Sequence, residues 1–146
     1  MKFARLIKSG PLAMDDSMKN RLLIIDDEPH ICEALKDRLE AMGCEVIVAH
    51  DGRTGLALMA LEARCVPLNG VLLDVHMPVM DGIEVLRELR VRHPDVPVLM
   101  MSAGSDHRVL QEAVRMGARD YVLKPFDATV LKETCDQVFS LWGGEA

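Results

Sequence analysis

Four charged side chains stand at the ends of three short apolar runs of the chain. They are Asp26 and Asp27, Asp74, and Lys124. The strands of an open parallel sheet end at a common crevice, where such folds place their active sites, so these side chains are expected to lie together. Three carboxylates beside a lysine suit a hard divalent cation and a phosphoryl group. The pattern therefore points to metal-assisted phosphoryl chemistry.

Five strand-like runs alternate with five helix-like segments and would position those residues. The predicted strands are residues 22–25, 45–49, 71–74, 98–102 and 120–124. Alternation of this kind predicts an α/β fold, a single doubly wound domain whose parallel sheet carries helices on both faces.

Local signals mark where the helices begin and which of their faces is apolar. Pro29 suits a first helical turn, Ser105 or Asp106 can cap the fourth helix, and Asp127 can cap the last. Helical spacing predicts the inner face of the second helix from its apolar residues, which are Leu56, Met59, Ala60 and Ala63.

Composition limits the class of protein. A chain of 146 residues with 49% hydrophobic residues fits one packed domain. A net charge of −6 argues against nucleic-acid binding by the domain itself. The longest apolar stretches fall well short of the roughly 20 residues that a membrane-spanning helix needs. We therefore expect neither direct nucleic-acid binding nor a membrane span.

The chain start and the cysteines bear on compartment. Arg5 interrupts the apolar residues of the basic start, so residues 1–19 are expected to be a flexible N-terminal extension and not a signal peptide. A short amphipathic docking or membrane-surface helix remains an alternative for this segment. The four cysteines show no metal-ligand spacing and are expected to be buried free thiols in a reducing cytoplasm: Cys32, Cys44, Cys65 and Cys135.

A set of short motifs resembles the receiver domain of two-component response regulators. The motifs are Asp26-Asp27, Asp74 with Met77-Pro78 and Gly82, Ser102-Ala103, Tyr121, and Lys124-Pro125. The resemblance covers about residues 20–142 and leaves 143–146 as a C-terminal tail. It implies a flavodoxin-like (βα)5 domain with strand order 2-1-3-4-5, dependence on Mg²⁺, and phosphorylation of one aspartate.

The resemblance also implies which acidic residue accepts the phosphoryl group and which residues bind Mg²⁺. Asp74 matches the phospho-acceptor. Asp26, Asp27 and Asp74 would hold one Mg²⁺, with Asp27 a direct ligand and Asp26 acting through water, and the backbone carbonyl of His76 would add an oxygen. The side chain of His76 is expected to be exposed and incidental. Read without the resemblance, Asp26-Asp27 could simply place charge at a helix N-terminus.

Three further residues take roles from the same resemblance. Lys124 would pair with the phosphoryl oxygens, aimed by a cis bond to Pro125. The hydroxyl of Ser102 would bind the new phosphoryl group, although local sequence alone also fits a turn serine. Tyr121 would be the switch aromatic, and we expect its ring to move when Ser102 does.

The leading functional hypothesis is a signalling switch rather than a metabolic enzyme. It would accept phosphate from a sensor histidine kinase or a histidine phosphotransfer protein and signal to a downstream effector protein. The contact face would be formed by the fourth helix, the fifth strand and the fifth helix. A phosphorylation-dependent homodimer is left open.

Three other hypotheses remain. The chain could be the receiver portion of a longer transcription factor, hybrid kinase or cyclase. It could be a pseudo-receiver that binds partners constitutively, or a metal-dependent phosphatase of the same fold class. The acceptor, the acidic pair and the lysine are all present, which disfavours the pseudo-receiver, and no second acid near the nucleophile or substrate cap is evident, which disfavours the phosphatase.

Overall fold

The computed structural model describes residues 19–104 and 106–140 of the chain. Its centre is a five-stranded parallel sheet in the order β2-β1-β3-β4-β5, which confirms the predicted fold class and strand order. The strands are β1 (Asn20–Ile25), β2 (Cys44–Ala49), β3 (Gly70–Asp74), β4 (Val98–Ala103) and β5 (Asp120–Lys124). The helices are α2 (Pro29–Ala41), α3 (Gly52–Ala63), α4 (Gly82–Arg92), α5 (His107–Arg115) and α6 (Ala128–Phe139).

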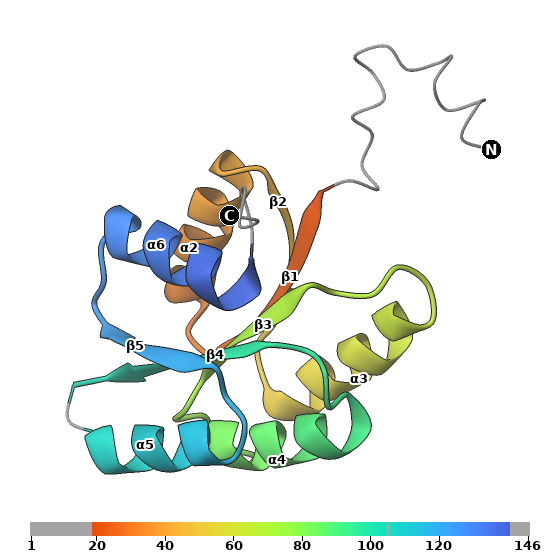
Figure 1. The fold of residues 1–146 in the computed structure, drawn as a ribbon, viewed down its shortest axis with the longest axis vertical. Coiled ribbons are helices and arrows are strands. Elements are labelled where there is room, and N and C mark those ends of the chain that lie inside the picture. The colour runs from red at the N-terminus through yellow and green to blue at the C-terminus, as the bar shows by residue number, and fades with distance from the viewer. Residues whose placement is uncertain (1–18, 105, 141–146) are drawn as a thin grey trace.

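The helices form two layers around the sheet (Figure 1). One layer is made by α2 and α6, and the other by α3, α4 and α5. Alternate residues of β1 serve the two faces: Leu22 and Ile24 belong to the core under α2 and α6, whereas Leu23 and Ile25 belong to the core on the other face. A strand buried on both faces has to be apolar throughout, which explains the unbroken run that predicts β1.

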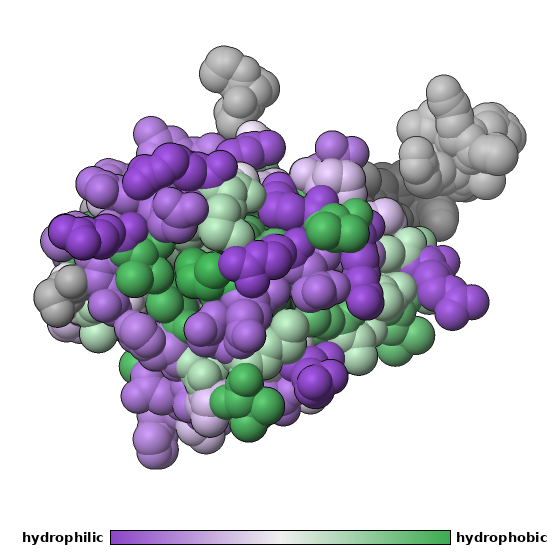
Figure 2. Space-filling view, turned by 90° about the horizontal axis from the view of Figure 1, so that it is seen from below, coloured by the Kyte–Doolittle hydropathy of each residue, from purple (hydrophilic) through white to green (hydrophobic). Residues whose placement is uncertain are grey.

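The outer faces of the second layer are polar. Figure 2 looks onto the side of α3, α4 and α5 and shows mostly hydrophilic side chains with smaller hydrophobic areas between them. The apolar side of α4 is turned inward, with Val85, Leu86 and Leu89 buried. α4 is thus amphipathic, as expected for a helix that covers one face of a sheet. Among the described residues, no helix is long and apolar enough to cross a membrane.

The predicted helix starts at Pro29 and Asp127 are confirmed. Asp127 caps α6 through its bond from the Val130 amide. Asp81 and Glu84 form a reciprocal capping box that fixes the start of α4. Asp106 occupies the N-cap position of α5, but its side chain makes no capping hydrogen bond there. Ser105, the other predicted cap, lies outside the described residues.

The predicted inner face of α3 is partly wrong. Ala60 and Ala63 are exposed, and the buried positions of this helix are Gly52, Gly55 and Met59. An added Cβ at Gly55 would lie 2.5 Å from the Ile25 side chain, so the helix approaches β1 through glycine. The side of α3 that faces inward is therefore the one where glycine lets the helix backbone approach β1 closely, rather than the one with most apolar side chains.

The cysteines follow the prediction with one exception. All four are free, and Cys32, Cys44 and Cys135 are buried. Cys65 is exposed, because α3 ends at Ala63 and the chain beyond it runs over the surface. Of the predicted N-terminal extension, residues 1–18 lie outside the described part of the chain.

Candidate functional site

The sheet brings the three predicted carboxylates together. Asp74 is the last residue of β3, and Asp26 directly follows β1, whose Ile25 pairs with Leu73 of β3. One oxygen from each of Asp26, Asp27 and Asp74 lies within 4.8 Å of the others. Asp26 is fully buried and Asp74 is 5% exposed, whereas Asp27 is half-buried. This group of oxygens could hold a hard divalent cation.

Lys124 reaches into the acidic cluster from the end of β5. Its ammonium donates to Asp26 Oδ2 at 2.8 Å and to Asp74 Oδ1 at 3.1 Å. A longer bond of 3.5 Å runs to Glu28. The Lys124–Pro125 peptide bond is cis, as the resemblance implied. Burial acts to lower the pKa of Lys124, but the bonds and charges of Asp26 and Asp74 outweigh it and raise the pKa, so the side chain stays cationic.

The cluster holds more negative charge than the lysine can balance. Burial, followed by the neighbouring charge of Asp26, raises the pKa of Asp74 to about 6, and Lys124 offsets only part of this rise. A divalent cation among the same oxygens would favour the ionised carboxylate. The donor set, all oxygen and partly open at Asp27, therefore fits Mg²⁺.

Asp26 is held in place by its surroundings. Its Oδ1 accepts a hydrogen bond from the Glu28 amide at 3.0 Å, while Oδ2 accepts from Lys124. Its backbone carbonyl accepts from the Cys32 thiol at 3.2 Å. Burial raises the pKa of this thiol to about 12, so it remains protonated and able to donate. The carboxylate of Asp26 is thereby fixed relative to β1 and the start of α2.

Gly82 fixes the loop that follows Asp74. Its amide donates to the Val75 carbonyl at 2.7 Å. A Cβ at this position would lie 2.1 Å from the backbone carbonyl oxygen of Asp74 and 2.8 Å from Val75 Cα. The first residue of α4 therefore has to be glycine for the helix to pack directly against the backbone of Asp74.

Ser102 lies at the end of β4, one residue past Met101, the pairing partner of Asp74. Its side chain is fully buried, and its hydroxyl donates to Asp106 Oδ2 at 2.7 Å. His76 Nε2 lies 2.6 Å from the same oxygen. His76 is exposed as expected, and its ring is paired with Asp106.

Asp106 is the site residue that sequence reasoning missed. An aspartate just before a helix is normally interpreted as an N-cap, and nothing in its spacing from Ser102 or His76 indicates that the three meet. The hydrogen bonds from Ser102 and then His76 lower the pKa of Asp106, so its carboxylate is ionised.

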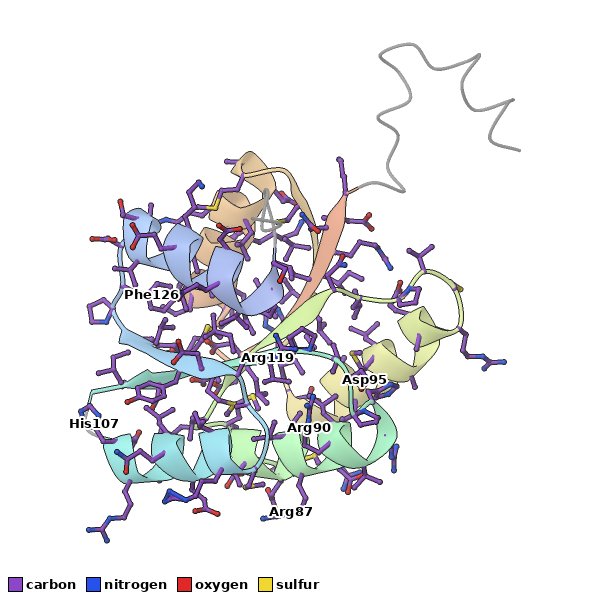
Figure 3. All side chains as sticks on the ribbon, viewed as in Figure 1. Arg87, Arg90, Asp95, His107, Arg119 and Phe126 are labelled. Carbon is purple, nitrogen blue, oxygen red and sulfur yellow. The ribbon has the colours of Figure 1, made fainter. Side chains whose placement is uncertain are left out.

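Tyr121 lies on β5, half-buried, and packs against the core beneath α3, α4 and α5. Figure 3 shows His107, at the start of α5, and Phe126, just beyond β5, at the left edge toward which β4 and β5 point. Arg90, Arg119 and Asp95 lie away from that edge. The site residues lie at or just beyond the carboxyl ends of β1, β3, β4 and β5, at one end of the sheet.

Comparison with known proteins identifies the family. The sequence model of the response regulator receiver domain matches residues 22–136. The chain belongs to the response regulator receiver family. It is a receiver domain of the two-component type, a family of signalling switches.

Similar proteins agree with this assignment. The regulatory protein AtoC of Escherichia coli is 42% identical over 108 residues, which are 74% of this chain and 23% of AtoC. A probable transcriptional regulator, ycf27 of Guillardia theta, is 38% identical over 127 residues, 87% of this chain and 48% of the relative. The chain thus spans less than half the length of each of these relatives.

Solved structures show the same fold. A response regulator receiver domain from Clostridium thermocellum superposes with a TM-score of 0.77 at 29% identity, covering 83% of this chain and 94% of the other. The chemotaxis protein CheY4 of Vibrio cholerae gives a TM-score of 0.74 at 30% identity, covering 82% of this chain and 98% of CheY4.

Proposed function

We propose that Asp74 accepts a phosphoryl group from a phosphohistidine, in a reaction that depends on Mg²⁺, and that this charge switches a protein-contact surface. The observation that supports this most strongly is the setting of Asp74: it ends β3, is almost fully buried, and lies beside two further carboxylates and the ammonium of Lys124. An aspartate with a purely structural role would not require two further carboxylates and a lysine beside it.

The chemical step is a transfer between two side chains. A carboxylate oxygen of Asp74 forms the new P–O bond as the N–P bond of the phosphohistidine breaks, and the departing imidazole takes a proton. A carboxylate is a weak nucleophile, so charge on the phosphoryl oxygens has to be neutralised. Lys124, already 3.1 Å from Asp74, supplies one positive charge to those oxygens. Water later hydrolyses the acyl phosphate and returns Asp74 to its carboxylate.

Asp26, Asp27 and Asp74, with the backbone carbonyl of His76, would hold the Mg²⁺. When bound, the cation supplies positive charge that neither Lys124 nor the backbone provides in sufficient amount. Asp26 is already engaged with Lys124 and the Glu28 amide, whereas Asp27 is the more open of the pair. This difference supports a direct bond from Asp27 and contact through water from Asp26.

A sensor histidine kinase or a histidine phosphotransfer protein would supply the phosphohistidine. A mostly apolar groove of about 420 Å³ opens beside Lys124, between α2 and the residues after β5. Ile31, Leu35 and Phe126 are among its lining residues. A partner helix lying in this groove could bring its histidine to the end of the sheet.

The output would be a change in the surface formed by α5, β5 and α6. Ser102 would donate its hydroxyl proton to the phosphoryl group, and Tyr121, half-buried on β5, would change its position with it. A downstream effector protein would recognise the altered surface. Among the similar proteins are transcriptional regulators, which favours an output domain or partner of that kind.

Intact-mass spectrometry tests the proposal directly. The protein is incubated with acetyl phosphate with and without Mg²⁺, as wild type, as Asp74→Asn, and as the matched control Asp95→Asn. Asp95 is exposed and lies away from the site, as Figure 3 shows. We expect one Mg²⁺-dependent phosphoryl adduct in the wild type and in Asp95→Asn, and none in Asp74→Asn. Equal labelling of Asp74→Asn would contradict the site assignment.

A further inference from the structure

Asp106 joins three parts of the chain at one carboxylate. Its Oδ2 accepts from the Ser102 hydroxyl at the end of β4 and lies 2.6 Å from His76 Nε2, in the loop after β3. Asp106 itself directly precedes α5. Both contacts of Asp106 Oδ2 are short, 2.7 Å to Ser102 and 2.6 Å to His76. The three residues come from segments that converge at the end of the sheet carrying Asp74.

The contact uses the only proton that Ser102 can donate. A serine hydroxyl has one O–H and two acceptor lone pairs. In this structure the stronger bond from Ser102 runs to Asp106 at 2.7 Å, with the Ala103 carbonyl at 3.3 Å as a weaker acceptor. A phosphoryl group on Asp74 would need the same proton. Asp106 and the phosphoryl group are therefore competing acceptors, and both are anionic.

We propose that Asp106 is a positioning residue that holds the Ser102 hydroxyl away from phosphorylated Asp74 and so opposes engagement of the switch. This inference rests on the proposed function, because it concerns the same phosphoryl group. His76 strengthens the restraint, since its ring nitrogen keeps the Asp106 carboxylate on the side of the acceptor loop.

The restraint also reaches the proposed output surface. Asp106 occupies the N-cap position of α5 with φ −96° and ψ 35°, and its carboxylate makes no bond to the first turn of the helix. Aspartate is among the best N-cap residues. Release of Ser102 leaves His76 as the remaining partner of this carboxylate, which can then turn toward the amides of the α5 first turn. Movement of one hydroxyl at the acceptor would thus be transmitted to the start of α5, where Figure 3 shows His107.

A double-mutant cycle with a phosphoryl mimic tests the role. The affinity for beryllofluoride in the presence of Mg²⁺ is measured by calorimetry for wild type, Asp106→Ala, Ser102→Ala and the double variant. We expect Asp106→Ala to bind roughly three- to tenfold more tightly than wild type, because the competing acceptor is gone. The same substitution in the Ser102→Ala background is expected to change the affinity by less than about twofold.

A merely structural role for Asp106 gives a different pattern. The substitution would then alter the affinity equally in both backgrounds, and that result overturns the proposal. Unchanged or weaker binding by Asp106→Ala alone also overturns it. If Asp106→Ala does not fold, Asp106→Asn replaces it in the cycle, and the uncharged amide is expected to give a smaller gain of the same sign.

The outcomes separate this inference from the function on which it rests. A wild-type protein that neither binds beryllofluoride nor forms an acyl phosphate would overturn both. A wild type that does both, with no effect of Asp106→Ala that depends on Ser102, would overturn only the role of Asp106.

Discussion

Replacing Gly82 by alanine is expected to disturb the position of Asp74 through the backbone alone. The added Cβ would lie 2.1 Å from the Asp74 carbonyl oxygen and 2.8 Å from Val75 Cα. Ordinary contacts are about 3.5 Å or longer, so the start of α4 and the end of β3 must move apart by roughly 1.4 Å. No side-chain rotation relieves the clash, because both neighbouring atoms belong to the backbone. Overpacking of this kind typically costs about 1 to 3 kcal/mol, and we expect about 3 kcal/mol of unfolding free energy to be lost.

Two measurements on the same samples test this expectation. Urea unfolding gives the loss of stability, and the rate of labelling by acetyl phosphate reports the position of Asp74. Gly43→Ala serves as the matched control, since Gly43 has φ +98° and no atom within 4 Å of the added Cβ. It follows α2, distant from the acceptor loop, so it should lose about 1 kcal/mol from backbone strain alone and label as fast as wild type.

The comparison between the two glycine variants tests whether the close approach at Gly82 positions Asp74. Gly82→Ala should label more slowly than Gly43→Ala under conditions in which both are folded. Gly82→Ala within about 0.5 kcal/mol of wild type, an ordinary surface effect, would refute the reasoning from close approach. Equal labelling rates for the two variants would show that the contact does not position Asp74.

Three further predictions follow from the same site. Val79→Gly should raise the unfolding free energy by about 1 kcal/mol in urea titrations. Val79 has φ 70° and is 92% exposed, so the substitution relieves backbone strain without loss of packing. A loss of stability would contradict this. Lys124→Met should bind Mg²⁺ at least as tightly as wild type in calorimetry, because Lys124 competes for oxygens of Asp26 and Asp74. The same variant should respond more weakly to beryllofluoride. An equal loss of Mg²⁺ binding and of the beryllofluoride response would exclude the role assigned to Lys124. In metal-free buffer, Asp74→Asn should be more stable than wild type at about pH 8, and this gain should shrink by about 1 kcal/mol on lowering the pH to about 5. The pKa of Asp74 is raised to about 6 in the folded protein, so the wild type regains stability as the pH falls through that value, and a gain independent of pH would argue against a buried, ionised Asp74.

The strands and helices could be predicted because sequence and burial agree along the sheet. β1 is apolar at every position from Leu22 to Ile25, as a strand covered on both faces must be. The carboxyl ends of parallel strands lie along one edge of the sheet, so Asp26, Asp74 and Lys124 could be expected there together, and the receiver resemblance supplied the strand order.

The features that could not be predicted depend on tertiary contact. The buried face of α3 is formed largely by Gly52 and Gly55, which hydrophobic periodicity cannot detect. Asp106 has the local sequence of a helix cap, and only the arrangement of β3, β4 and α5 brings Ser102 and His76 to its carboxylate.

Reductive trapping tests the central claim most directly. After incubation with acetyl phosphate and Mg²⁺, borohydride converts an aspartyl phosphate to homoserine, and peptide mass spectrometry locates the altered residue. The account predicts homoserine at position 74 only, and only when Mg²⁺ is present. Homoserine at Asp27 or at another acid, or labelling at position 74 that is independent of Mg²⁺, would contradict it.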